Sequence, residues 1–439
     1  MKRTLLFGTI FLASQSYASN GGVNLGSSMT TGPSSNPYSM AAASNNPALN
    51  ALIVDKDENF RTSYFPNFGV NVELGDVDDF IEEVEDLTDI IDDPSLAPIG
   101  ESTQQTLDRF NLVLKDLGES GYLKNSAAIN VPLFPLYFQA DAIGGTIGFS
   151  LHAELIAGIS ILDEELQYNN QNSSFTTATS IYLKAGVEKT FAVSYGRDVP
   201  INDWFNEQGT LYAGVKLKAM NMELSKQVIP LESLDSDDIG DIIKDEYDNN
   251  QVTSTELGVD IGVAWVADNY SLGLTLENAN SPEFEYGAVG VACSSIEENT
   301  PRRTNCEAAA YFSQVKGEID PTETYTKDAM LRADILFKFS ERWQLTSAID
   351  LAEYNDVIGF ENQWLHVATT YDADSWILPS VRLGYHSNLA GTETSSASLG
   401  FTLFNSLALD FEYGLESIDV DGTKAPRRAG FSLSMEESF

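Results

Sequence analysis

The sequence consists largely of short segments in which apolar and polar residues alternate. Close to the end of the chain, for example, single serine residues separate Phe431, Leu433 and Met435. Successive side chains of a β-strand point to opposite faces, so a period of two predicts strands with one apolar and one polar face. About fourteen such segments, of the roughly ten residues expected for strands that cross a membrane, lie at residues 66–75, 125–139, 145–160, 178–194, 209–224, 252–266, 269–279, 326–339, 342–352, 363–371, 377–386, 395–404, 406–414 and 427–438.

The connections between these segments alternate in length. The even-numbered gaps are mostly short, such as DAIGG, ADN and SER, whereas the odd-numbered gaps are mostly long; residues 196–208 form the one longer even gap. Outer-membrane barrels have short periplasmic turns and long outer loops. The pattern therefore predicts an all-β protein, a transmembrane barrel of about fourteen antiparallel strands in the outer membrane of a Gram-negative bacterium, with both termini periplasmic. The alternative, a soluble exported sheet protein, gives no reason for the alternating gap lengths.

The N-terminal sequence predicts export. A basic start, an apolar run too short to cross a bilayer and small residues ending at Ala18 predict a signal peptide over residues 1–18. The next stretch is rich in Gly, Ser, Asn and Ala, and we assign residues 19–60 to an N-terminal hatch or plug and residues 61–439 to the barrel. The terminal Phe439 is expected to be recognised by the outer-membrane insertion machinery.

The charge balance excludes one class of partner. The chain has 25 Lys and Arg residues against 65 Asp and Glu residues, a formal net charge of −40. Because phosphate binding needs clustered cations, we expect no nucleic-acid partner. The expected surroundings are instead outer-membrane lipid and lipopolysaccharide.

The first long loop carries two runs of apolar residues with helical spacing. They predict two short amphipathic helices, which could form a lid over the barrel or a decoration without function. The residues concerned are Phe80, Val84, Leu87 and Ile91 in the first run, and Leu107, Phe110, Leu114 and Leu117 in the second.

No sequence motif indicates catalysis. The H-E-x-x-H, G-x-S-x-G, P-loop and C-x-x-C patterns are all absent from the sequence, so we expect a non-enzyme without a cofactor. His152, His366 and His386 fall on the inward side of their strands and are expected to line the lumen.

Residues 235–246 approach the pattern of a calcium-binding loop. Asp235, Asp237 and Glu246 occupy ligand positions, but Ile239 stands where an oxygen ligand is needed. An acidic, solvated helix is therefore the favoured interpretation, and we predict no metal site.

Two pairs of residues suggest local constraints. Cys293 and Cys306 lie in a polar stretch of an exported chain and are predicted to form a disulfide, the alternative being two free thiols.

Pro132 and Pro135 interrupt the second strand segment. Since proline cannot donate to a strand ladder, they mark either a kink in the wall, through which an apolar solute could leave sideways, or a strand end at the periplasmic rim.

A family resemblance centres on Asn46, Pro47 and Ala48, which follow the Gly- and Ser-rich start and precede the first strand. With the acidic helical stretch after that strand, this region resembles the TraF-type conjugal transfer proteins, a group that is similar in architecture to the FadL-type long-chain fatty acid transporters. The resemblance implies that the N-P-A segment belongs to a hatch inside a fourteen-stranded barrel.

The resemblance implies two possible functions. The first is a passive channel for small hydrophobic molecules, and apolar pockets beside the hatch would favour it. The second is an envelope or surface barrel associated with conjugal plasmid transfer and without transport activity. A lumen without a pocket and filled by salt bridges would favour this second function; the charged residues concerned are Lys216, Lys218, Asp260, Arg332 and Asp334.

Overall fold

The protein is described here by a computed structural model. It describes residues 24–33, 36–55, 58–63, 67–93, 95, 102–140, 142–171, 173–201, 208–233, 239–373, 375–420 and 422–435. The predicted signal peptide, Phe439, Asp235 and Asp237 lie outside these residues.

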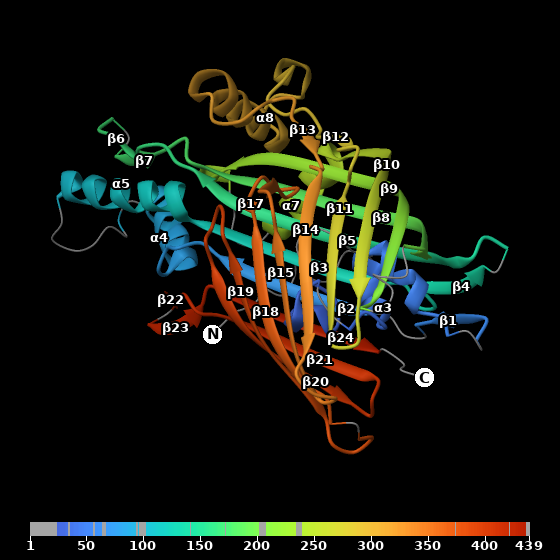
Figure 1. Ribbon diagram of the computed structural model, residues 1–439. Helices are drawn as coiled ribbons and strands as arrows, with labels where there is room; N and C mark the ends of the chain where they lie inside the picture. Colours follow the sequence, from blue (N-terminus) through green and yellow to red (C-terminus); the bar gives the residue numbers. More distant parts are fainter. Residues whose placement is uncertain are drawn as a thin grey trace.

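Fourteen strands form a closed antiparallel barrel (Figure 1). The main sheet has 16 strands: fourteen close the ring, and β1 (Phe60–Thr62) and β4 (Leu136–Ala140) extend the wall beside β5, where β4 continues the pairing that β3 begins. Each predicted segment overlaps one strand of the ring, which confirms the predicted fold. In ring order the strands are β2 (Phe68–Leu74), β3 (Tyr122–Asn130), β5 (Gly145–Leu162), β8 (Ser180–Val199), β9 (Thr210–Pro230), β10 (Val252–Val266), β11 (Tyr270–Glu277), β14 (Met330–Lys338), β15 (Trp343–Asp350), β18 (Trp364–Tyr371), β19 (Ser380–Asn388), β20 (Ser395–Leu403), β21 (Leu407–Gly414) and β24 (Arg428–Met435), and β24 pairs with β2.

Side-chain parity separates the outer surface of the barrel from its interior. Leu217 of β9 and Leu257 of β10 are 57% and 68% exposed, whereas Lys218 and Asp260 on the same two strands are 2% and 0% exposed. Apolar side chains therefore cover the outside and polar side chains fill the inside. This is the orientation that the alternating pattern predicts.

The wall of the barrel is much taller on one side than on the other. Strands β5, β8 and β9 have 18, 20 and 21 residues, whereas β2 has 7. Helices α4 (Phe80–Asp92) and α5 (Thr103–Ser120) pack on the outward-facing Ile181 and Ile229 near the ends of the tall strands. These are the two helices predicted for the first long loop. Their contacts place them beside the wall and not over the barrel, where a lid would lie.

Helix α5 begins where its sequence provides a capping box. The Ser102 hydroxyl accepts a hydrogen bond from the Gln105 amide, and the Gln105 side chain accepts one from the Ser102 amide. From this start Phe110, Leu114 and Leu117 follow at intervals of three or four residues and are fully buried. Local capping and helical periodicity thus account for this helix.

The interior is filled from both ends of the barrel. From the N-terminal segment come α2 (Ser28–Thr31), α3 (Met40–Asn45) and η1 (Pro47–Leu52). From the long loops come Phe284 and Val357, which pack with the inward-facing Met220 and Met222. The loop elements are β6 (Gln167–Asn169), β7 (Ser174–Thr176), η3 (Leu231–Ser233), α7 (Ile239–Asn250), β12 (Glu283–Glu285), η4 (Cys293–Ser295), α8 (Pro301–Tyr311), η5 (Phe312–Lys316), β13 (Thr324–Thr326), β16 (Tyr354–Asn355), β17 (Glu361–Asn362), β22 (Ser417–Val420) and β23 (Thr423–Pro426).

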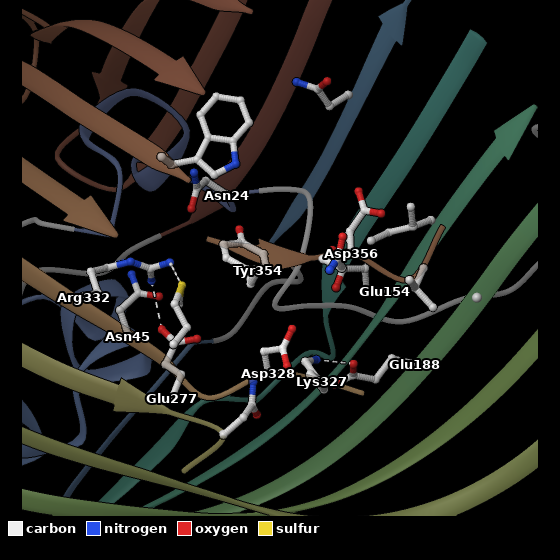
Figure 2. Close-up of a pocket in the computed structure, with 18 of the residues that line it drawn as sticks. Asn24, Asn45, Glu154, Glu188, Glu277, Lys327, Asp328, Arg332, Tyr354 and Asp356 are labelled. Atoms are coloured by element: carbon white, nitrogen blue, oxygen red, sulfur yellow. Dashed lines mark hydrogen bonds and ion pairs between the residues drawn. The ribbon is translucent and has the colours of Figure 1, made fainter. Parts of the chain in front are cut away.

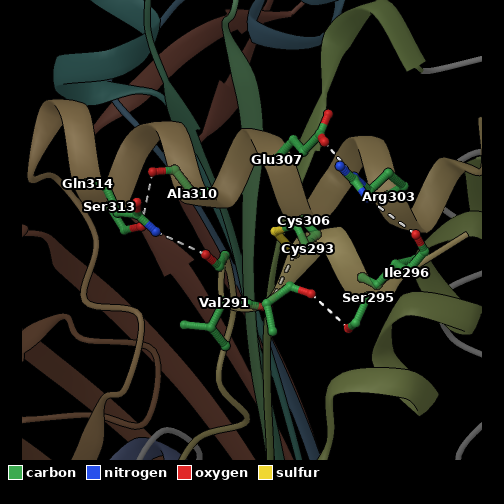
Figure 3. The surroundings of a disulfide bond; sticks show 12 residues. Val291, Cys293, Ser295, Ile296, Arg303, Cys306, Glu307, Ala310, Ser313 and Gln314 are labelled. Carbon is green, nitrogen blue, oxygen red and sulfur yellow. Dashed lines mark hydrogen bonds and ion pairs between the residues drawn. A yellow bond between two sulfur atoms is a disulfide. The ribbon is translucent and has the colours of Figure 1, made fainter. Parts of the chain in front are cut away.

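The loop that carries η4 and α8 contains the predicted disulfide. Cys293 and Cys306 are bonded, with their Cα atoms 5.6 Å apart (Figure 3). The Arg303 side chain, one turn of α8 earlier, donates to the carbonyl oxygen of Ile296 at 3.3 Å. The link therefore fixes the start of α8 to the preceding turn.

Among the described residues, none of the helices is long and apolar enough to cross a membrane.

Candidate functional site

A cavity of about 100 Å³ lies inside the barrel, between the N-terminal segment and the loops (Figure 2). Asn24, Met29 and Asn45 of the N-terminal segment line one side of it, and Tyr325 and Tyr354 of the loops line another. Strand residues complete the walls. Two parts of the chain that are not strands of the barrel thus contribute to the cavity wall.

The cavity wall is rich in charged side chains, and most of them are paired. Arg332 donates to Glu277 at 2.9 Å and to Asp350 at 2.7 Å. Lys327, in the loop before β14, forms an ion pair with Glu188. Burial lowers the pKa of Lys327, but the neighbouring carboxylates outweigh this effect and raise the pKa above its ordinary value. The lysine is therefore held in its charged form.

A second ion-pair group lies where the barrel closes. The Arg428 guanidinium of β24 donates to Glu73 of β2 at 2.6 Å and to Glu412 of β21 at 2.8 Å. It also lies over the Trp364 ring, 4.7 Å from the ring centre. One buried side chain thus connects the last strand to the first strand and to β21.

A third group lies on β9 and β10. Lys218 and Lys216 pair with the Asp260 carboxylate at 2.6 and 3.3 Å, and Asp260 also accepts a hydrogen bond from the Asn278 amide at 2.9 Å. Asp334 lies beside Gly273 on the neighbouring strand pair. Ion pairs and a cavity are therefore both present, so the lumen combines the features expected for each of the two functions.

The three histidines point inward, as their parity predicts. His366 and His386 line the cavity, and their Nδ1 atoms lie 2.5 Å apart. His386 Nε2 forms a hydrogen bond of 2.8 Å with the Ser398 hydroxyl. His152 is buried on β5. No group of three or more His, Cys, Asp or Glu residues is arranged to hold a metal ion in the part of the chain that the structure describes.

Glu246 is the described member of the calcium-loop candidate. It lies on α7, where its carboxylate accepts a hydrogen bond of 3.3 Å from the Asn250 side chain of the same helix. The two aspartates of the candidate, Asp235 and Asp237, fall outside the described residues.

Asn46, Pro47 and Ala48 lie inside the barrel against β8, β9 and β10. The Asn46 side chain accepts from the Ala48 amide at 3.0 Å and so caps η1, and Pro47 occupies the first position of that helix. Ala48 is fully buried. The N-P-A sequence therefore gives the segment a rigid, capped turn at the point where it meets the wall.

Pro132 and Pro135 lie in a break of the wall. Strand β3 ends at Asn130, β4 begins at Leu136, and both pair with β5, so the prolines interrupt one strand in its middle. The Phe134–Pro135 peptide bond is cis. Among the described residues β1 pairs only with β4, while β24 pairs with β2 and β21.

A seam therefore separates β1 from the end of β24. The Ser63 hydroxyl, which donates to the carbonyl oxygen of Met435 at 3.3 Å, is a contact across it. On the inner side Met29 lines the cavity and also packs on Ala128, two residues before the end of β3. The N-terminal segment thus lies between the cavity and the break.

The sequence did not single out the Arg428 group or the Lys327 pair. One signal was available for Arg428, because a charged residue on the inward face of a barrel strand is expected to have a partner or a function. Lys327 offered none, since it lies in a loop that only the folded chain places inside the barrel.

Comparison with known proteins identifies a family. The sequence profile described as "F plasmid transfer operon, TraF, protein" matches residues 43–350. The chain belongs to this family. Among curated proteins, none matches this TraF-family chain.

Solved structures similar to the TraF-family chain include a Pseudomonas aeruginosa FadL homologue, the P. putida toluene transporter TodX and the CymD monoaromatic hydrocarbon channel. Their identities are 14%, 13% and 11%, with TM-scores of 0.39, 0.46 and 0.44. The matches cover 96%, 95% and 95% of this chain and 97%, 99% and 98% of the respective structures.

Proposed function

We propose that this TraF-family barrel lies in the outer membrane and is a passive channel, closed by its N-terminal segment, for small hydrophobic molecules that carry a polar group. The cavity inside the barrel, with the N-terminal segment between it and a break in the wall, carries the proposal. Met29, Ile156, Met222 and Val357 give the cavity apolar surface, and the ion-paired carboxylates give it polar surface. A solute with both kinds of surface fits such a chamber.

The proposed membrane placement follows from the outer surface. Exposed leucine, valine and phenylalanine side chains cover the outward faces of the strands, which favours lipid as their surroundings. The short turns and the end of β24 lie at the same end of the barrel, and we assign this end to the periplasm, with the long loops among lipopolysaccharide. Recognition of Phe439 by the insertion machinery belongs to the same proposal.

A second candidate function is an envelope barrel associated with conjugal transfer and without transport. Two observations favour it, namely the TraF family membership and the ion pairs that fix the inner walls. It predicts a lumen that stays closed to solutes whatever happens to the N-terminal segment.

Removal of residues 24–55 is expected to separate the two functions. We expect uptake of labelled fatty acid into liposomes to rise about tenfold or more, because losing closed-state contacts worth about 1.4 kcal/mol already shifts an open–closed equilibrium tenfold. The intact protein at equal density is the control, and an encapsulated dye reports general leakage. No uptake by either form would reject transport and favour the envelope function.

Sideways exit can be tested at the seam. A short thiol crosslinker between Ser63→Cys and Met435→Cys is expected to reduce uptake of the fatty acid severalfold, because it joins the two sides of the break. The matched control joins Val367→Cys to Tyr385→Cys, an in-register pair in the continuous part of the wall. Equal uptake by both crosslinked forms would place the exit elsewhere.

A further inference from the structure

Three glycines form a continuous row across the inner wall of the barrel. Gly214 of β9 lies directly opposite Gly196 of β8 and Gly262 of β10 in the strand register. All three belong to the inward-facing set of positions on their strands. The row leaves a strip of bare backbone across three adjacent strands.

The N-P-A segment occupies this strip. A Cβ atom on Gly214 would lie less than 3.0 Å from the carbonyl group of Pro47, and one on Gly262 would lie equally close to the Asn46 side chain. A Cβ atom on Gly196 would meet the Pro47 carbonyl oxygen. For Gly214 and Gly196 the atoms met are backbone atoms of a capped turn, which cannot move aside as the end of a flexible side chain can.

Hydrogen bonds hold the segment on both sides of the row. Asn46 Nδ2 donates to the carbonyl oxygen of Val263 at 3.1 Å, and Asn50 Nδ2 donates to the Ser194 hydroxyl at 2.7 Å. Lys216 Nζ donates to the carbonyl oxygen of Ser44 at 2.7 Å. Each of the three bonds joins the segment to a residue beside one of the glycines, so the wall binds it through shape and polar contacts together.

Other inward glycines of the same strands do not contact the segment. A Cβ atom on Gly186 of β8 would meet side chains of Val357 and Leu224, and one on Gly258 of β10 would meet the ends of the Met220 and Lys218 side chains. On β8, β9 and β10 the absence of a Cβ atom is therefore matched to the backbone of the N-terminal segment at the row and not at Gly186 or Gly258.

We infer that Gly196, Gly214 and Gly262 form a docking groove for the N-P-A segment and that seating in this groove keeps the lumen closed. Opening then consists of the capped turn leaving the groove, while the strands stay paired. The inference rests on the proposed plug role of the N-terminal segment, and it assigns control of closure to the wall as well as to the plug.

The test uses Gly214→Ala, with Ser44→Cys as a reporter on the N-terminal segment. Ser44 is partly buried, and a cysteine is close in size to the serine it replaces. Because Cys293 and Cys306 are joined in a disulfide, the new cysteine is the one free thiol of the chain. We expect a polymer-linked maleimide, too large to enter the closed lumen, to label the alanine variant at least tenfold faster than the parent. Gly258→Ala is the matched control and is expected to label at the parent rate.

Labelling and conductance together separate the possible failures. Faster labelling with higher conductance of planar bilayers supports both the groove and the channel. Faster labelling without conductance supports the groove and rejects transport. Unchanged labelling of Gly214→Ala, in a barrel that keeps its heat-modifiable migration on gels, overturns the groove. In a chain without residues 24–55, Gly214→Ala is expected to leave conductance unchanged. A change in the conductance of this truncated chain would also overturn the docking groove.

Discussion

Replacing Asp260 by alanine is expected to lower the free energy of unfolding by about 3–5 kcal/mol, the usual cost of removing one partner from a buried ion pair. The Asp260 carboxylate is fully buried and compensates two lysines, Lys216 and Lys218, which are themselves almost completely buried. Without it, two positive charges face each other inside the barrel with no carboxylate between them. The Asn278 amide also loses its acceptor.

The measurement is urea-induced unfolding of the protein reconstituted in lipid vesicles, followed by tryptophan fluorescence. Lys189→Gln provides the matched control, because Lys189 pairs with Glu223 at 2.7 Å on the outer face of the tall wall, where the two side chains are 41% and 25% exposed. That change is expected to cost no more than about 1 kcal/mol. Equal effects of the two substitutions would show that the interior ion pairs do not support the barrel.

Replacing Arg428 by methionine is expected to cost a similar amount, about 3–5 kcal/mol, because it leaves the buried carboxylates of Glu73 and Glu412 without their shared cation. The effect should be concentrated where the barrel closes, since the guanidinium joins β24 to β2 and β21. We expect loss of heat-modifiable migration on gels at a lower temperature than for the parent protein.

A triple variant distinguishes the pairing itself from the cost of unpaired charge. Replacing Glu73 and Glu412 by leucine together with Arg428 by methionine removes all three charges and keeps a similar volume. Buried ion pairs replaced in this way are often neutral or stabilising, so the triple variant is expected to recover most of the lost stability. A triple variant as unstable as the single one would mean that the hydrogen-bond geometry, and not charge compensation, holds the closure.

The strands could be predicted because their signal is local. Leu257 and Asp260 take opposite faces of β10 for the same reason that any neighbouring odd and even positions of a strand do. The two loop helices were predictable for a related reason, since Phe110, Leu114 and Leu117 follow the helical period. The Cys293–Cys306 disulfide closes a short loop, so its partners are also near each other in sequence.

The ion pairs inside the lumen could not be predicted, because the two residues of each pair are far apart in the sequence. Lys124 pairs with Asp356 across 232 residues, and Lys327 pairs with Glu188 across 139. Alternation places each charge on the inward face but does not say which strand or loop it will meet. The inward folding of residues around Phe284 and Val357 is a property of the assembled barrel.

The prolines also show what the sequence of a single strand leaves undecided. Pro132 and Pro135 were readable as breakers of a ladder, but a break and a strand end look alike in sequence. Only the pairing of β4 with β5 beyond the prolines distinguishes the two.

Closure of the ring by β2 and β24 has a consequence for how the protein is made. Phe68 lies opposite Leu433 in the register, and the Gly26 amide bonds to the Ser432 hydroxyl across 406 residues. Joining chain ends this far apart costs on the order of 5 kcal/mol of loop entropy before any contact compensates it. Until the last strand arrives, the growing sheet presents an open edge that can pair with other chains. Folding should therefore be slow, and truncation of only the final strand should be more damaging than loss of an entire long loop.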